Sequence, residues 1–201
     1  MARITGLAVA VLVSVAPLLA DAPRVSKQDA ERFQAKLTKI VEFGNAKPAA
    51  KAAAPRSIAV TDIEVNSYLR FKANDQIPVG IVEPELSAIG DGRVSGRAIV
   101  DLDAVRKQKQ RGWLDPLAYL GGQLPVTAAG RLTTKEGKGQ FLLESAEIKG
   151  VPIPKTVLQE LLTYYSRTPE NPSGINMDAP FELPARIREI RVGSGTSTVV
   201  Q

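Results

Sequence analysis

Residues 123–166 read QLPVTAAGRLTTKEGKGQFLLESAEIKGVPIPKTVLQELLTYYS, and this stretch decides the fold. Residues 124–134 predict a strand, residues 135–139 predict a turn because they hold two glycines, and residues 140–149 predict the returning strand. The two prolines of residues 151–154 are expected to break the ladder, because each removes an amide donor. A helix is predicted next from one apolar stripe, which comprises Val157, Leu158, Leu161, Leu162 and Tyr165.

A first long hairpin is predicted at residues 81–101, with Gly-Asp-Gly at 90–92 as its turn. Because side chains alternate along a strand, one face of the two hairpins is apolar and small at its centre. The residues of this face are Val94, Gly96, Ala98, Val100, Val126, Ala128, Gly130, Leu132, Phe141 and Leu143. Two interpretations stay open. The small residues let the following helix approach the sheet closely, or they leave a slot for an acyl chain, which the helix stripe also lines.

The order of elements predicts an α+β fold, in which a curved antiparallel sheet of long hairpins is wrapped against one or two amphipathic helices. Residues 56–201 are expected to form this domain. A second helix is predicted after the capping-box pattern Thr61-Asp-Ile-Glu64. Residues 187–192 and 196–200 predict a closing hairpin.

The segment before this domain has three predicted parts. Residues 1–20 have a positive charge, an apolar run and small residues at the end, which predicts a cleaved signal peptide; an uncleaved anchor is the alternative. Residues 21–43 predict an amphipathic helix, which packs on the domain or binds a partner. Residues 44–55 are rich in alanine and proline and predict a linker. We therefore expect a tethered helix, and a domain that folds cooperatively without residues 21–54.

Composition excludes several mechanisms. The chain of 201 residues has no cysteine and no histidine, so it has neither a Ser-His-Asp triad nor a histidine or thiolate zinc site, and no cofactor motif occurs. Without cysteine, an exported chain carries no disulfide and is not a lipoprotein. Aromatic residues make up 5%, which argues against a nucleic-acid partner. The net charge of +5 allows weak attraction to an anionic membrane surface.

The plan of the chain resembles one half of a tubular lipid-binding (TULIP) domain, and most of all the small bacterial LmeA-like phospholipid-binding proteins of the envelope. The residues that carry the resemblance are 90–94 (GDGRV), 130–132 (GRL), 148–154 (IKGVPIP) and 181–192 (FELPARIREIRV). The resemblance covers residues 56–200 and implies a curved sheet and a helix that enclose an apolar groove for acyl chains. It transfers no binding residue.

The leading hypothesis is therefore an exported, non-enzymatic protein, periplasmic or extracellular, that binds lipid or another hydrophobic ligand. The rival is a structural or partner-binding envelope protein with a filled core. A hydrolase built on paired carboxylates is a third hypothesis, because Glu83 and Glu85, and also Asp101 and Asp103, are closely spaced. Cross-strand ion pairs with arginines explain these acids without chemistry. The sequence leaves the ligand, the process and the oligomeric state open.

Overall fold

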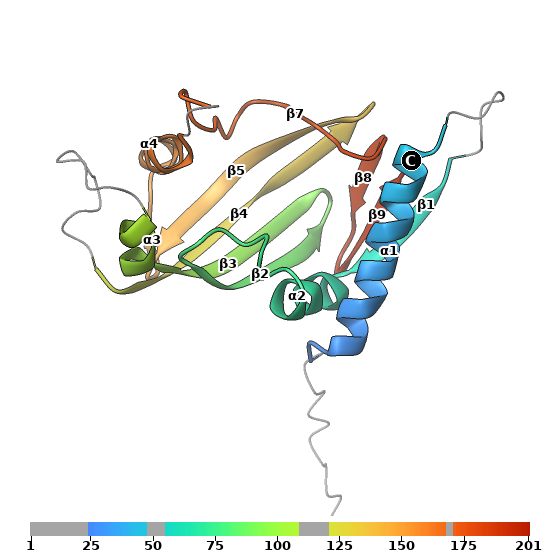
Figure 1. The fold of residues 1–201 in the computed structure, drawn as a ribbon. Coiled ribbons are helices and arrows are strands. Elements are labelled where there is room, and N and C mark those ends of the chain that lie inside the picture. Colours follow the sequence, from blue (N-terminus) through green and yellow to red (C-terminus); the bar gives the residue numbers. More distant parts are fainter. Residues whose placement is uncertain (1–23, 48–54, 109–120, 168–170) are drawn as a thin grey trace, which may run out of the picture.

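The computed structural model describes residues 24–47, 55–108, 121–167 and 171–201, and it shows an α+β protein with two antiparallel sheets (Figure 1). The predicted signal peptide and most of the predicted linker lie outside the described residues. The elements, in chain order, are α1 (Lys27–Asn45), β1 (Ser57–Thr61), α2 (Asp62–Phe71), β2 (Ile81–Gly90), β3 (Arg93–Asp101), α3 (Leu102–Gln108), β4 (Gln123–Lys135), β5 (Lys138–Ile148), β6 (Val151–Pro152), α4 (Lys155–Ser166), β7 (Phe181–Glu182), β8 (Glu189–Val192) and β9 (Thr196–Val200).

The larger sheet has the strand order β2-β3-β4-β5-β6, and β7 pairs with the other end of β5. We call β2 to β7 the large sheet. Its two long hairpins, β2–β3 and β4–β5, lie where the sequence predicts them, and both are antiparallel. The sheet is curved and does not close into a barrel. The predicted fold class is thus confirmed.

The prediction that the prolines break the ladder is wrong at Pro152. Val151 and Pro152 form the two-residue strand β6, which pairs with Ile148 and Glu147 through a turn at Gly150. A proline is compatible with a strand whose outer edge needs no amide donor. The helix α4 then begins directly after Pro154, which occupies its N-cap without a side-chain hydrogen bond.

The closing hairpin does not extend the large sheet. Strands β8 and β9 form a separate three-stranded sheet with β1, in the order β1-β9-β8, with Ser57 opposite Val200. Helices α1 and α2 pack together beside this sheet. We call α1, α2, β1, β8 and β9 the helix–sheet core.

Helix α1 is integral to this core, so the expectation of a tethered helix is wrong. Ala30 and Ile40 on one side of α1 are 0% and 5% exposed. The ring of Phe33 meets Tyr68 of α2 edge-on, with centroids 5.2 Å apart. At the far end of the chain, the side-chain amide of Gln201 donates to the carbonyl of Ile40. Of the two predicted outcomes for this helix, the structure therefore shows packing on the domain.

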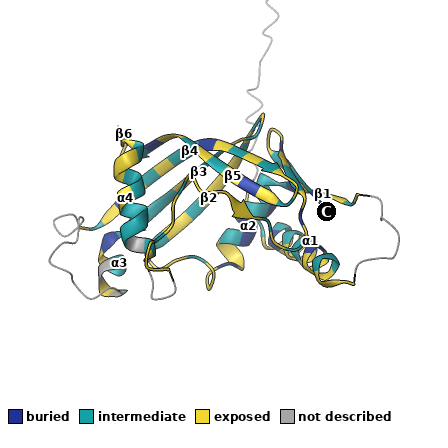
Figure 2. Cartoon of the chain, turned by 90° about the horizontal axis from the view of Figure 1, so that it is seen from above, coloured by how far each residue is buried: buried dark blue, intermediate teal, exposed yellow. Residues whose placement is uncertain are grey.

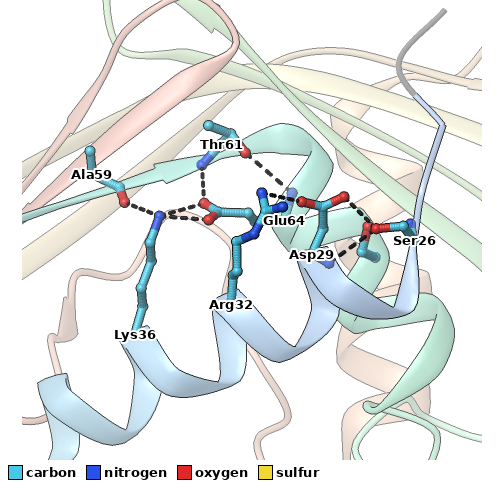
Figure 3. Close-up of polar contacts among 8 residues, drawn as sticks. Ser26, Asp29, Arg32, Lys36, Ala59, Thr61 and Glu64 are labelled. Carbon is cyan, nitrogen blue, oxygen red and sulfur yellow. Dashed lines mark hydrogen bonds and ion pairs between the residues drawn. The ribbon is translucent and has the colours of Figure 1, made fainter.

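An ion pair joins α1 to α2 (Figure 3). The ammonium of Lys36 lies 2.7 Å from both carboxylate oxygens of Glu64 and donates to the carbonyl of Ala59. Glu64 also closes the predicted capping box with Thr61, which the structure confirms. Burial of Glu64 opposes its ionisation, but the hydrogen bonds from Lys36 and Thr61 outweigh burial and lower the pKa of this carboxyl.

Among the described residues, most buried apolar side chains belong to the helix–sheet core or the segments that adjoin it. Those residues are Ala30, Ile40, Val60, Tyr68, Ala73, Ile187, Val192 and Val200. In and beside the large sheet the buried apolar residues among those described are Leu102, Leu124 and Ala146. Figure 2 shows that most residues of the large sheet and α4 are half-buried or exposed.

Candidate functional site

The large sheet has one apolar face, which we call the inner face. The strand register identifies the residues of this face, because residues directly opposite each other on paired strands point to the same side of the sheet. Gly96, for example, lies opposite Leu86 on β2 and Ala128 on β4, and Ala128 lies opposite Ala146. The inner face comprises Ile81, Leu86, Ala88, Val94, Gly96, Ala98, Val100, Leu124, Val126, Ala128, Gly130, Leu132, Phe141, Leu143, Ala146 and Ile148.

A bulge in β5 is needed to assemble this face. Ala129 pairs with Ser145 and Gly130 with Leu143, so Glu144 has no partner across the ladder. Without the extra residue, Phe141 and Leu143 would point away from Ala146. The structure therefore brings together every strand residue that the sequence assigned to the site.

The inner face is incompletely covered by the described residues. Leu124, Gly130 and Ala146 are buried, but the other members are half-buried or exposed, and Leu86 is 47% exposed. In a filled protein interior, aliphatic side chains at the centre of a sheet are close-packed on all sides. This face therefore retains apolar surface that the described part of the chain leaves in contact with solvent.

The small residues are covered by side chains of the sheet itself. A Cβ added to Gly130 would lie 2.5 Å from the ring of Phe141, and one added to Gly96 would lie 3.3 Å from Leu86. Among the described atoms, Gly96 has no neighbour from α4 within 4 Å of such a Cβ. The interpretation in which Gly96 and Gly130 admit the helix α4 is therefore wrong at both positions, because Leu86 and Phe141 occupy that space.

Two helices flank the large sheet at opposite edges (Figure 1). Helix α2 lies along β2, where the side-chain amide of Asn66 bonds both the N–H and the carbonyl of Leu86, each at 2.8 Å. Asp62 accepts from the N–H of Ala88. These contacts satisfy backbone groups on the outer edge of β2, which protects it from pairing with another chain.

Helix α4 packs against β5 at the other edge. Leu158, Leu161 and Leu162 of the predicted stripe are half-buried, and the side chain of Tyr165 lies outside the described part of the structure. No described residue of α4 is buried. The described residues of the stripe therefore lie beside β5 without being buried.

A cleft of about 540 Å³ lies beside the inner face, between the C-terminal half of α2 and the start of β2. The sequence analysis did not identify it. Phe71, Val79 and Val82 line it and are 37–54% exposed, while Ile81 belongs to both the cleft and the inner face. Its volume lies within the range of small-molecule pockets. Because residues 72–80 form irregular backbone, no periodic pattern marks the cleft in the sequence.

The closely spaced acids are engaged in surface contacts. Glu85 pairs with Arg97 at 2.7 Å, and Glu83 lies 3.7 Å from Arg70. Asp101 accepts hydrogen bonds from the N–H groups of Asp103 and Ala104, at the start of α3. Among the described residues, no group of carboxylates is arranged to hold a metal ion. The predicted cross-strand ion pair is thus present for Glu85, whereas Glu83 and Asp101 have other partners.

No protein-family model and no curated protein matches this chain. Among solved structures, a crystal structure of lipopolysaccharide binding protein is similar at 15% identity and a TM-score of 0.22. The match covers 72% of this chain and 40% of that chain. This similarity is too low to assign a shared fold. Within the described residues, no helix has the length and apolar character to cross a membrane.

Proposed function

We propose that this protein binds a lipid or another hydrophobic ligand on the inner face of the large sheet, as an exported, non-enzymatic protein of the cell envelope. One observation carries the proposal. The hydrogen-bonded strands hold a continuous apolar face in place, yet only three residues of this face are buried: Leu124, Gly130 and Ala146. Apolar surface of this extent is typical of a ligand or partner site.

The size of the inner face agrees with an acyl chain as the ligand. From Leu124 to Leu132 the strand β4 extends for about 26 Å, at ~3.3 Å per residue. The hydrocarbon core of a bilayer is ~30 Å thick, so the chain of one leaflet spans about 15 Å. A single acyl chain therefore fits along the strands, and each methylene removed from water contributes about 0.8 kcal/mol.

The test replaces two small residues of the inner face with larger ones. In Ala98→Leu plus Ala128→Leu, the added methyl groups occupy the space of the ligand. We expect binding of parinaric acid, a fluorescent fatty acid, to weaken about tenfold or more, and lipid that co-purifies from membranes to disappear from the mass spectrum. Ala129→Leu is the matched control, because Ala129 lies on β4 but pairs with Ser95 and Ser145 on the opposite face.

The outcomes separate the binder from a structural protein with a filled core. A binder keeps its melting temperature in the double variant and loses only the ligand. If wild type binds neither parinaric acid nor co-purified lipid, and the double variant melts earlier, the binding proposal is wrong and the structural alternative is favoured.

Export is tested separately. Protein recovered from the envelope of the native host is expected to begin at or near Asp21, which intact-mass measurement reads directly. Detection of the chain with Met1 in the folded envelope protein would contradict export by a cleaved signal peptide.

A further inference from the structure

The two helices beside the large sheet, α2 and α4, are attached to the molecule in different ways. Helix α2 holds Ser67 and Tyr68 in the helix–sheet core, at 0% and 8% exposure, and bonds the backbone of β2 through Asn66. Helix α4 has no buried residue among those described and no side-chain N-cap. One of these helices is therefore anchored in the helix–sheet core, and the described residues of the other are not buried.

Polar side chains of α4 bond to the chain that returns from it. The carbonyl of the Gln159 side chain accepts from the N–H of Met177 at 2.8 Å, and its amide donates to the carbonyl of Ile175 at 2.9 Å. Ser166 accepts from the N–H of Ile175 at 2.7 Å, and Lys155 pairs with Asp178. Helix α4 and residues 171–178 therefore form one unit, which we call the α4 arm.

Short tethers connect the α4 arm to the large sheet. Strand β6 is two residues long and pairs with Glu147 and Ile148, while β7 is two residues long and pairs with Lys138 and Gly139. Both tethers are on the same strand, β5. Beyond them, the side chain of Gln140 donates to the carbonyl of Asp178 at 3.2 Å. These contacts connect the arm to β5 near both ends of that strand and lie outside the β4–β5 ladder.

Large apolar side chains on the arm and its tethers are exposed: Val151 at 63%, Val157 at 44%, Ile175 at 51% and Phe181 at 44%. The stripe of Leu158, Leu161 and Leu162 is only half-buried. An apolar chain placed beside this stripe would remove more of it from water, which stabilises the closed position of the arm.

We propose that the α4 arm is a movable wall of the ligand site, which swings on β6 and β7 to admit an acyl chain and then retains it. This inference rests on the proposed function of the inner face. It predicts that the rate of ligand exchange depends on the tethers and on the integrity of the arm, while α2 and the helix–sheet core stay unchanged.

The first experiment locks one tether. Lys138 and Glu182 are opposite each other across β5 and β7, and antiparallel partners have Cα atoms about 4.5–5.5 Å apart, which suits a disulfide. The native chain has no cysteine, so Lys138→Cys plus Glu182→Cys introduces the only pair. We expect release of parinaric acid to slow about tenfold in the oxidised protein, and reduction to restore it. Ser95→Cys plus Ala129→Cys, a cross-strand pair within β3 and β4, is the control.

The second experiment loosens the arm. Gln159→Ala removes both bonds from Gln159 to residues 175–177, so we expect release to accelerate about tenfold. Gln159→Glu keeps the acceptor for Met177 and is expected to give an intermediate rate. Glu160→Ala, an exposed neighbour, is the control. Amide hydrogen exchange is expected to increase in α4 and residues 171–183 of Gln159→Ala, and to stay unchanged in α1 and α2.

These experiments distinguish a failure of the movable wall from a failure of the binding site. Equal release rates in the oxidised, reduced and Gln159→Ala proteins would overturn the movable wall and leave the binding site standing. A uniform rise of hydrogen exchange over the whole chain in Gln159→Ala would also overturn it, because the arm would then belong to the core. Wild type that binds no parinaric acid would remove the proposed function and this inference together.

Discussion

The helix–sheet core and the large sheet use the same apolar residue types with opposite results. In the helix–sheet core, side chains from α1, α2, β1, β8 and β9 pack together, and Ala30 and Tyr68 are only 0% and 8% exposed. In the large sheet, a longer apolar face stays half-buried beside α4. Stability is therefore expected to reside in the smaller region, and the larger region is left with apolar surface for another purpose.

The comparison is tested most severely by deleting α1. Removal of residues 21–46 exposes Tyr68 and Ser67 and leaves Glu64 without Lys36. We expect a loss of more than about 5 kcal/mol of unfolding free energy, enough to abolish a cooperative thermal transition in a marginally stable domain. A truncated chain that still melts in a single transition near the wild-type temperature would show that the large sheet is stable on its own.

The next largest effect is expected from Lys36→Ala. The side chain of Glu64 is 6% exposed, so its charge would remain buried without its partner. Loss of one member of such a pair costs about 3 kcal/mol, measured by denaturant titration. Lys39→Ala, on the exposed side of α1, is the control and should change stability by less than about 0.5 kcal/mol. A similar small change for Lys36→Ala would mean that α1 is held by apolar contacts alone.

Low pH should weaken the same contact between α1 and α2. Because the folded state lowers the pKa of Glu64, the stability that this carboxylate contributes is present above its unfolded pKa and is lost as the pH falls through the lower, folded value. We expect unfolding free energy to decline below about pH 4.5 in wild type. The decline should be shallower in Glu64→Gln, whose amide does not titrate. Parallel pH profiles would exclude Glu64 as a source of acid sensitivity.

One substitution type compares the two regions directly. Ala30→Leu forces a larger side chain into a site with 0% exposure, which should cost about 2–3 kcal/mol. Ala98→Leu on the inner face should cost less than about 1 kcal/mol, because Ala98 is only half-buried. Equal costs in thermal melts would show that the inner face is filled.

The smallest effect is expected at the edge of the large sheet. Asn66→Ala frees the N–H and the carbonyl of Leu86, for a cost of about 1 kcal/mol. The exposed edge should also promote self-association at high concentration, which light scattering would detect. Asn74→Ala, beyond the end of α2, is the control. A monomeric Asn66→Ala variant at all concentrations would show that β2 needs no such protection.

The sequence predicted the parts of the fold that depend on neighbouring residues. The hairpin turns, the capping box of Thr61 and Glu64 and the alternation on β3 and β4 are local signals, and the structure confirms them. Part of the inner face followed from the same alternation, but its members Leu86 on β2 and Ala146 on β5 were not among the predicted site residues.

Features that depend on distant contacts were not predictable in this way. The apolar stripe of α1, which includes Ala30, left packing on the domain and binding a partner both open, and the alanine-rich segment after the helix suggested a tether. The bulge at Glu144 has no glycine or proline to mark it. The cleft beside Phe71 is formed by irregular backbone, for which periodicity gives no signal.

The pairing of β1 with β9 has a consequence for the order of folding. Ile40 and Gln201 are bonded across 161 positions of the chain, whereas the hairpins of the large sheet join neighbouring strands. Closing a long loop costs more chain entropy and is slower than forming a local hairpin. We therefore expect the hairpins that carry the inner face to form early, and the region with most buried apolar groups to assemble last and fix the native state.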